Sequence, residues 1–72
     1  LYSPPPNEPA LRIATIEKMQ ENLNTRGYDA GGVDGRIGPM TRAALRAFQR
    51  AAGLTPDGHP DSDTLEALGV KP

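Results

Sequence analysis

The sequence predicts an all-α fold, a small three-helix bundle with two related Asp-Gly turns. Two observations predict the helices: apolar residues recur at spacings of three and four in three segments, and glycine or proline stands at the ends of these segments. A third observation predicts the turns, because one pattern of helix, turn and helix occurs twice along the chain. The chain has 72 residues, which suffices for one domain with one modest core.

The first helix is expected between Pro9 and Arg26. Proline suits the first turn of a helix, and Gly27 follows the last apolar position, where a left-handed cap would end the helix. Polar residues fill the opposite face, so the segment is amphipathic. The apolar stripe consists of Leu11, Ile13, Ile16, Met19 and Leu23.

The second helix is expected to start at Gly38-Pro39 and to run to Gly53, with Leu45 and Phe48 on its apolar side. Several alanines between these positions allow neighbouring elements to approach closely.

A short third helix is expected from about Ser62 to Leu68, with Asp61 or Ser62 as its N-cap. Leu65, Leu68 and Val70 would complete the core.

The internal repeat gives the turns a common pattern. In each copy an Asp-Gly pair is followed, at the same spacing, by a threonine and then by Ala-Leu, and the second copy lies 23 residues after the first. The first copy consists of Asp34-Gly35, Thr41 and Ala44-Leu45, and the second of Asp57-Gly58, Thr64 and Ala67-Leu68. The middle helix therefore ends one copy and begins the other.

Composition limits the partners. Eight Lys and Arg against nine Asp and Glu give a net charge of -1, which predicts no binding to nucleic acid or to a membrane surface. No apolar run has the length of a membrane span or signal-peptide core, and the absence of cysteine excludes disulfides and thiolate sites. Four of the eight prolines lie in LYSPPPNEP, so residues 1–9 are expected to be a linker and residues 10–70 the domain.

The segment that carries the repeat resembles the peptidoglycan-binding type 1 domain, a wall-binding module of bacterial cell-wall hydrolases. The resemblance covers about residues 11–70 and depends on an ordered series of positions: Gln20, Leu23, Gly27-Tyr28, Asp34-Gly35, Gly38, Thr41, Ala44, Phe48-Gln49, Gly53-Leu54, Asp57-Gly58 and Leu68. Two departures are the glycine-rich Ala30-Gly31-Gly32 and the sequence His59-Pro60-Asp61 after the second Asp-Gly. The resemblance implies a monomeric, non-catalytic module without cofactor that binds peptidoglycan. It also implies a parent hydrolase, such as a lytic transglycosylase or an amidase, in the periplasm or cell envelope.

The Asp-Gly turns are interpreted as structural. Aspartate can accept hydrogen bonds from the amides just ahead of it, and glycine adopts a positive φ without a Cβ clash. The threonine hydroxyls are expected to meet free amides in the first turns of the second and third helices. No catalytic residue and no metal ligand is assigned, because no phosphate-loop or calcium-loop spacing occurs and His59 is expected to be a solvated turn residue.

The candidate ligand-binding residues surround the first turn. Arginines four apart along the second helix are expected to form a ridge beside this turn, and guanidinium groups pair well with the carboxylates of peptidoglycan stem peptides. A tyrosine at the entrance of this turn would be half buried. These candidates are Tyr28, Asp34, Arg36, Arg42 and Arg46.

Three alternatives remain open at this stage. The arginines can be an ordinary solvated face, the domain can be a spacer or pro-segment that packs against its parent without binding the wall, and three helices can form a DNA-binding helix-turn-helix. The long turns and the net charge of -1 argue against DNA binding.

Overall fold

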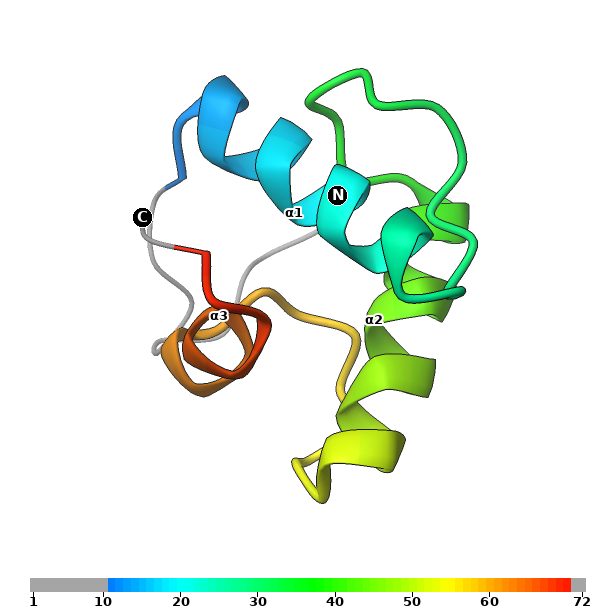
Figure 1. Cartoon of the computed structure of the whole chain (residues 1–72), viewed down its shortest axis with the longest axis vertical. Coiled ribbons are helices and arrows are strands. Elements are labelled where there is room, and N and C mark those ends of the chain that lie inside the picture. The colour runs from blue at the N-terminus through cyan, green and yellow to red at the C-terminus, as the bar shows by residue number, and fades with distance from the viewer. Residues whose placement is uncertain (1–10, 71–72) are drawn as a thin grey trace.

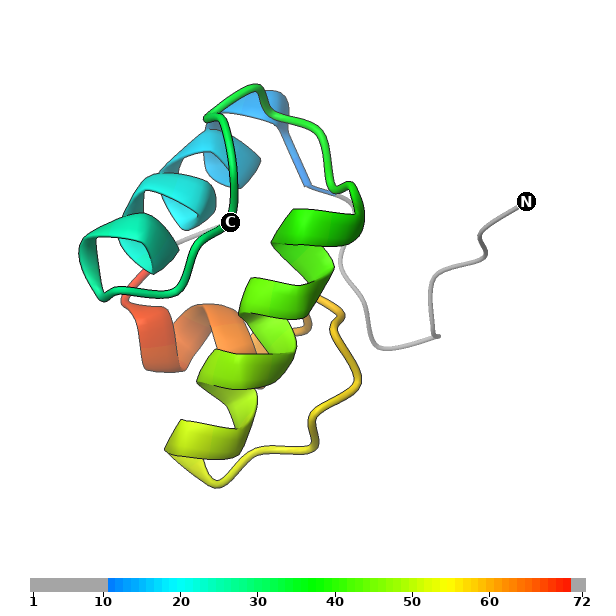
Figure 2. The same cartoon turned by 90° about the vertical axis from the view of Figure 1, so that its right-hand side faces the viewer.

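The computed structural model describes residues 11–70, and these residues form three helices and no strand. The helices are α1 (Ile13–Thr25), α2 (Pro39–Ala52) and α3 (Ser62–Leu68). In Figure 1, α2 runs from top to bottom of the view, whereas α3 is seen nearly end-on. Figure 2 shows α3 below α1. The predicted all-α fold is confirmed, whereas the predicted linker, residues 1–9, lies outside the described residues.

The core lies where α1 packs against both α2 and α3. Its largest members are Met19 and Leu23 from α1, Leu45 and Phe48 from α2, and Leu65, Leu68 and Val70 from α3 and the residues after it. The predicted core positions on the second and third helices are therefore confirmed. Ile13 is the exception on α1, because 66% of its surface remains exposed at the first helical position.

The first helix starts later than the sequence predicted. Leu11 and Arg12 are not helical, and Arg12 is an extended N-cap without a side-chain capping bond. Leu11 and Ile16 both pack against the core, and they occupy the positions before the N-cap and at the fourth helical residue. Apolar residues at these two positions fix the entry of a chain into a helix. The start at Ile13 therefore follows from packing a partly buried, non-helical Leu11 against the core.

The other helix boundaries follow the glycine and proline signals. Helix α1 ends in a Schellman pattern, in which the Tyr28 amide donates to the Leu23 carbonyl at 2.8 Å. Helix α2 begins with Pro39 and is capped by Gly53. Helix α3 has Asp61 as N-cap, whose carboxylate accepts from the Thr64 amide at 3.3 Å. The predicted ends of the second and third helices are confirmed.

Candidate functional site

A buried glutamine holds the first Asp-Gly turn. Gln20, with none of its surface exposed, accepts a hydrogen bond from the Gly35 amide on Oε1 at 3.0 Å. Its Nε2 lies 3.1 Å from Asp34 Oδ1, 2.8 Å from the Arg36 carbonyl and 3.2 Å from Thr41 Oγ1. One amide side chain on α1 therefore joins the turn to the first residues of α2.

A second glutamine repeats this arrangement around the second turn. Gln49 Oε1 accepts from the Gly58 amide at 2.9 Å. Its Nε2 lies 3.0 Å from Asp57 Oδ1, 2.9 Å from the His59 carbonyl and 2.9 Å from Thr64 Oγ1. We call the two arrangements the Gln20 clamp and the Gln49 clamp. The repeat seen in the sequence is thus a repeat of one hydrogen-bonded unit.

The aspartates of both turns serve the backbone, as the sequence predicted. Asp34 Oδ1 accepts from the Arg36 amide at 2.9 Å, and Asp57 Oδ1 accepts from the His59 amide at 2.9 Å. Gly35 and Gly58 both have a φ of +73°, a region that glycine adopts without strain. The prediction that these glycines are structural is confirmed.

Hydrogen bonding keeps both carboxylates charged. The Arg36 amide and, after it, the Gln20 side chain lower the pKa of Asp34 below its ordinary value of 3.8. Burial by itself raises the pKa of Asp57, but the hydrogen bonds from the His59 amide and the Gln49 side chain outweigh burial and lower it below 3.8. Neither group has the raised pKa that a general acid at neutral pH requires.

The threonines do not meet free helix amides, and this part of the prediction was wrong. Thr41 Oγ1 donates to the Ala30 carbonyl at 3.1 Å, and Thr64 Oγ1 donates to Asp61 Oδ1 at 2.6 Å. Each hydroxyl also accepts from the glutamine of its clamp. The hydroxyls are drawn inward because the buried amide needs an acceptor there.

The two turns differ in the side chains that lie against them. A Cβ on Gly35 would meet the side chains of Ile13 and Glu17 of α1, whereas a Cβ on Gly58 would meet the Arg46 side chain and the Arg42 carbonyl oxygen of α2. Arg42 Nη1 donates to the Gly58 carbonyl at 2.8 Å and lies 3.1 Å from His59 Nδ1.

Arg42 therefore lies at the second turn and not beside the first, which corrects the predicted ridge. Helix α2 follows the first turn in the chain, but the Arg42 side chain on this helix lies against the second turn. His59 is half buried and joined to Arg42, so it is not the solvated residue that the sequence predicted.

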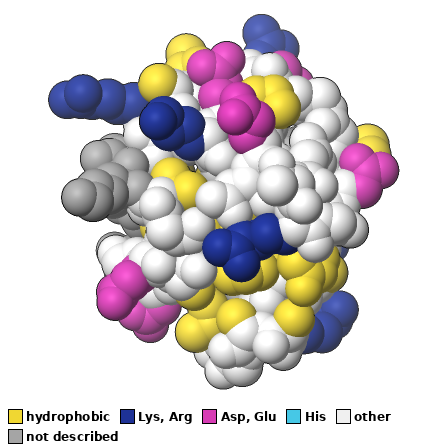
Figure 3. Space-filling model, viewed as in Figure 1, with side chains coloured by type: hydrophobic (Ala, Val, Ile, Leu, Met, Phe, Trp, Pro, Cys, Tyr) yellow, Lys and Arg dark blue, Asp and Glu magenta, His cyan; other side chains and the backbone are white. Residues whose placement is uncertain are grey.

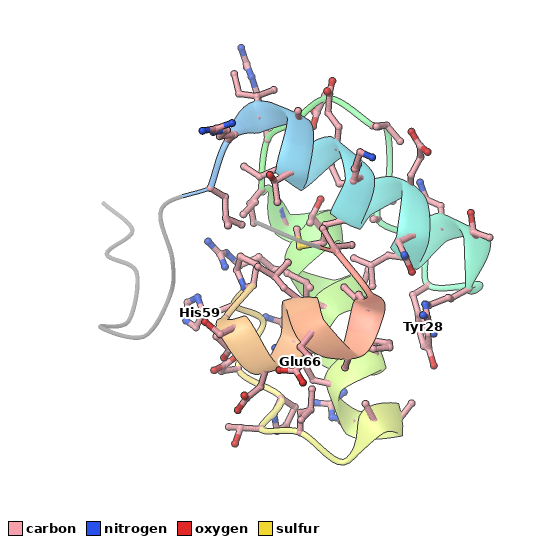
Figure 4. The ribbon with its side chains drawn as sticks, turned by 60° about the vertical axis from the view of Figure 1, so that its left-hand side comes forward. Tyr28, His59 and Glu66 are labelled. Atoms are coloured by element: carbon pink, nitrogen blue, oxygen red, sulfur yellow. The ribbon has the colours of Figure 1, made fainter. Side chains whose placement is uncertain are left out.

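Tyr28 is half buried, as expected, but it lies apart from the second turn. Its ring meets the ring of Phe48 edge to face, with centroids 5.9 Å apart, and the guanidinium of Arg26 lies 5.5 Å from the Phe48 centroid. Figure 4 shows Tyr28 and His59 on opposite sides of the molecule. The structure thus distributes the five candidate residues over several surfaces instead of one groove.

Two of the hollows on the described surface bear on the candidate residues or on α1. The larger, about 830 Å³, lies between the length of α1 and Gly69-Val70 and is lined by charges of both signs. The smaller, about 160 Å³, lies beside the first turn and includes Asp34, Arg36 and Met40 in its lining. We call the smaller one the first-turn hollow. Of the candidates, it contains Asp34 and Arg36.

The described residues contain no group of His, Cys, Asp and Glu side chains suited to a metal ion. None of the three helices is long and apolar enough to cross a membrane. Figure 3 shows acidic and basic side chains interspersed over one face of the molecule, in keeping with the net charge of -1.

Comparison with known proteins found a matching family and similar chains. The profile of a family described as "Putative peptidoglycan binding domain" matches residues 13–68. SltB3 from Pseudomonas aeruginosa, solved in complex with NAG-anhNAM-pentapeptide, is 38% identical and superposes with a TM-score of 0.81. That match covers 92% of this chain and 18% of the SltB3 chain.

Two further relatives share the same region. The localization factor PodJL of Caulobacter vibrioides is 40% identical over 62 residues, which are 86% of this chain and 6% of PodJL. The N-acetylmuramoyl-L-alanine amidase CwlM of Mycobacterium tuberculosis is 38% identical over 53 residues, 74% of this chain and 13% of CwlM. The chain spans only a small part of each of these relatives.

Proposed function

This chain belongs to the peptidoglycan-binding domain family, and we propose that it is a non-catalytic module that binds peptidoglycan and holds a parent cell-wall hydrolase on its substrate. The observation that carries the proposal is the family match over residues 13–68 together with the similarity to parts of SltB3 and of the amidase CwlM. A unit found in larger proteins of different names is best understood as contributing binding, while chemistry resides elsewhere in each protein.

The geometry supports a role without catalysis. Both turn aspartates accept hydrogen bonds from backbone amides and from a clamp glutamine, and His59 is joined to Arg42. A nucleophile needs a base within hydrogen-bond reach, and a pair of carboxylates needs a cleft that holds substrate between them. The described residues offer neither arrangement.

The parent and the location are part of the proposal, and the relatives support them. A lytic transglycosylase or an amidase as parent would place the module in the periplasm or cell envelope. The similarity to PodJL, which is named as a localization factor, shows that related segments also occur in proteins with other names. A spacer that packs against its parent therefore remains the alternative to wall binding.

We propose a binding surface with two parts for the candidate residues. Asp34 and Arg36 line the first-turn hollow, while Arg42 and Arg46 flank the second turn. Tyr28, which is half buried against Phe48, contributes the part of its side chain that remains exposed. Exposed charged contacts are individually weak, about 0.2–1 kcal/mol each, so retention on the wall depends on a polymer that offers many equivalent sites.

Co-sedimentation with insoluble peptidoglycan tests the proposal. The purified chain is expected to pellet with sacculi, to be released by salt because exposed charges are screened, and to liberate no soluble muropeptides. The double variant Arg36→Ala with Arg46→Ala is expected to lose retention. The matched control, Lys18→Ala with Arg50→Ala, removes the same charge from exposed positions outside the first-turn hollow and the second turn. A chain that never pellets with sacculi would support the spacer instead.

A further inference from the structure

The first-turn hollow is formed by a segment that the second repeat lacks. The Gln20 clamp joins residues 14 apart in the chain, whereas the Gln49 clamp makes the equivalent bond to its aspartate over only 8 residues. Part of the additional length is Ala30-Gly31-Gly32, which forms one wall of the hollow. Because the second clamp closes its turn without such a wall, the fold itself does not require it.

Hydrogen bonds from α1 and α2 hold this wall in place. The Ala30 amide donates to Asn24 Oδ1 at 2.7 Å, and Asn24 Nδ2 donates to the Gly31 carbonyl at 3.0 Å. On the other side, Thr41 Oγ1 donates to the Ala30 carbonyl at 3.1 Å. Asp29 also accepts from the Gly31 amide at 3.0 Å. The glycine-rich segment is therefore a fixed wall and not flexible filler, which favours binding because little ordering is left to be done.

Two opposite charges line the hollow without a direct salt bridge between them. The side chains of Asp34 and Arg36 are exposed, and no ion pair joins them in the described part of the chain. Gln20 and the Arg36 amide both donate to Asp34 Oδ1. One carboxylate and one guanidinium therefore face solvent side by side.

An apolar edge completes the hollow. Met40 is 53% exposed, and its sulfur lies 3.3 Å from the position that a Cβ of Gly31 would take. Gly31 has a φ of +79°, so a side chain there would be strained and would also displace Met40. The methionine thus rests on the glycine wall with half of its surface available to a ligand.

The size of the hollow limits what it holds. Its volume of about 160 Å³ is below the range of roughly 300–1,000 Å³ typical of sites for whole small-molecule ligands. It fits the end of an extended ligand. That end should carry a positive and a negative charge close together on a short aliphatic stem.

We propose that the first-turn hollow binds the zwitterionic end of a diamino acid in the peptide stem of peptidoglycan. The carboxylate of this end lies on Arg36, its ammonium group on Asp34, and its aliphatic stem against Met40. The inference rests on the proposed function and adds to it the part of the polymer that is recognised. Each exposed charged contact is expected to change the dissociation constant by roughly 1.5- to 5-fold.

A titration followed by two-dimensional ¹H–¹⁵N NMR tests this assignment. The probes are three soluble stem peptides that differ only at the diamino acid: meso-diaminopimelate, its amide at the free carboxylate, and lysine, which lacks that carboxylate. Saturable shifts are expected at the amides of residues 30–36 and 40–41. The meso-diaminopimelate peptide should bind roughly 1.5- to 5-fold more tightly than either of the other two.

The variant Arg36→Gln identifies the carboxylate contact. It should weaken binding of the meso-diaminopimelate peptide to the level of the lysine peptide and leave the lysine peptide unchanged, as in a double-mutant cycle. Arg50→Gln, an exposed arginine on the same chain, is the matched control and should change neither affinity. An unaltered pattern of amide peaks away from the hollow checks that both variants are folded.

Three results would overturn the inference: equal affinity for all three peptides, shifts confined to the second turn or to the larger hollow between α1 and Gly69-Val70, or no effect of Arg36→Gln. Sedimentation with sacculi separates this failure from failure of the proposed function. A chain that pellets with sacculi but does not discriminate among the peptides binds the wall through another part of it. A chain that binds neither sacculi nor peptides refutes both proposals.

Discussion

Replacing Gln20 by leucine tests whether the clamp holds the first turn. Leucine is close to glutamine in volume but can neither accept from the Gly35 amide nor donate to the three acceptors around Nε2. Gly35 is buried, so its amide would lose its partner in a place that water does not reach. A buried donor left without a partner costs about 1–3 kcal/mol.

Loss of the donor to the three acceptors lowers the free energy of unfolding less than loss of the acceptor for the Gly35 amide. Asp34 and Arg36 are exposed, so water can replace the lost donor there, while Thr41 keeps its bond to the Ala30 carbonyl. We therefore expect Gln20→Leu to lower the free energy of unfolding by about 2–4 kcal/mol. A domain of this size has a total stability of about 4–11 kcal/mol, so the melting temperature should fall by roughly 8–30 °C.

Thermal unfolding by circular dichroism measures this loss, and amide hydrogen exchange locates it. Exchange at Gly35 should accelerate in Gln20→Leu while exchange at Gly58 keeps its relative protection, and Gln49→Leu should give the reverse pattern. Glu21→Leu, an exposed neighbour on the same helix, controls for the added leucine and should stay within about 0.5 kcal/mol of the wild type. A melting temperature of Gln20→Leu within about 2 °C of the wild type would refute the clamp.

Three further predictions concern the turns. Gly35→Val should destabilise the fold by about 1–3 kcal/mol in thermal unfolding, because a β-branched residue is strained at a φ of +73°; an unchanged melting temperature would mean that the turn adapts freely. Because the folded-state pKa of Asp57 is lowered from 3.8, its contribution to stability is present above about pH 5 and is lost as the pH falls through 3.8 and below. Asp57→Asn should accordingly be less stable than the wild type at pH 7 and lose less stability between pH 5 and 3, and parallel acid-unfolding curves would contradict this. Arg42→Ala should lower the melting temperature by several degrees since it removes the donor to the Gly58 carbonyl, whereas Arg46→Ala, which makes no such bond, should leave it almost unchanged; equal effects would contradict the assignment.

Local signals were sufficient to predict the helices and the turns. Pro39 and Gly53 mark the ends of α2, and the Asp-Gly pairs predict tight turns, because each signal acts through the conformation of its own residues. The start of α1 was placed too early, since Leu11 packs against the core without being helical and an apolar spacing alone does not distinguish this from a helical turn.

The long-range hydrogen bonds could not be derived in this way. The positions that carry the family resemblance include a glutamine before each Asp-Gly pair, yet nothing local tells that the Gln20 side chain is buried and reaches a turn 14 residues away. The same holds for Arg42, whose partner at Gly58 depends on how the second loop folds back along α2. The available signal for these hydrogen bonds was a polar residue that recurs in an otherwise apolar stripe.

Salt separates the stability of this fold from the binding proposed for it. The clamp donors are neutral amides of Gln20 and Gln49, so no clamp bond joins two full charges, and the core around them is apolar. Salt screens interactions between exposed charges with a decay length of about 10 Å at 0.1 M. It acts little on buried hydrogen bonds. The proposed contacts of the exposed Arg36 and the half-buried Arg46, in contrast, are with a ligand that approaches from solvent. Added salt should therefore release the chain from the wall under conditions in which its melting temperature hardly changes, and this difference would show that binding depends on exposed charges and not on the clamps.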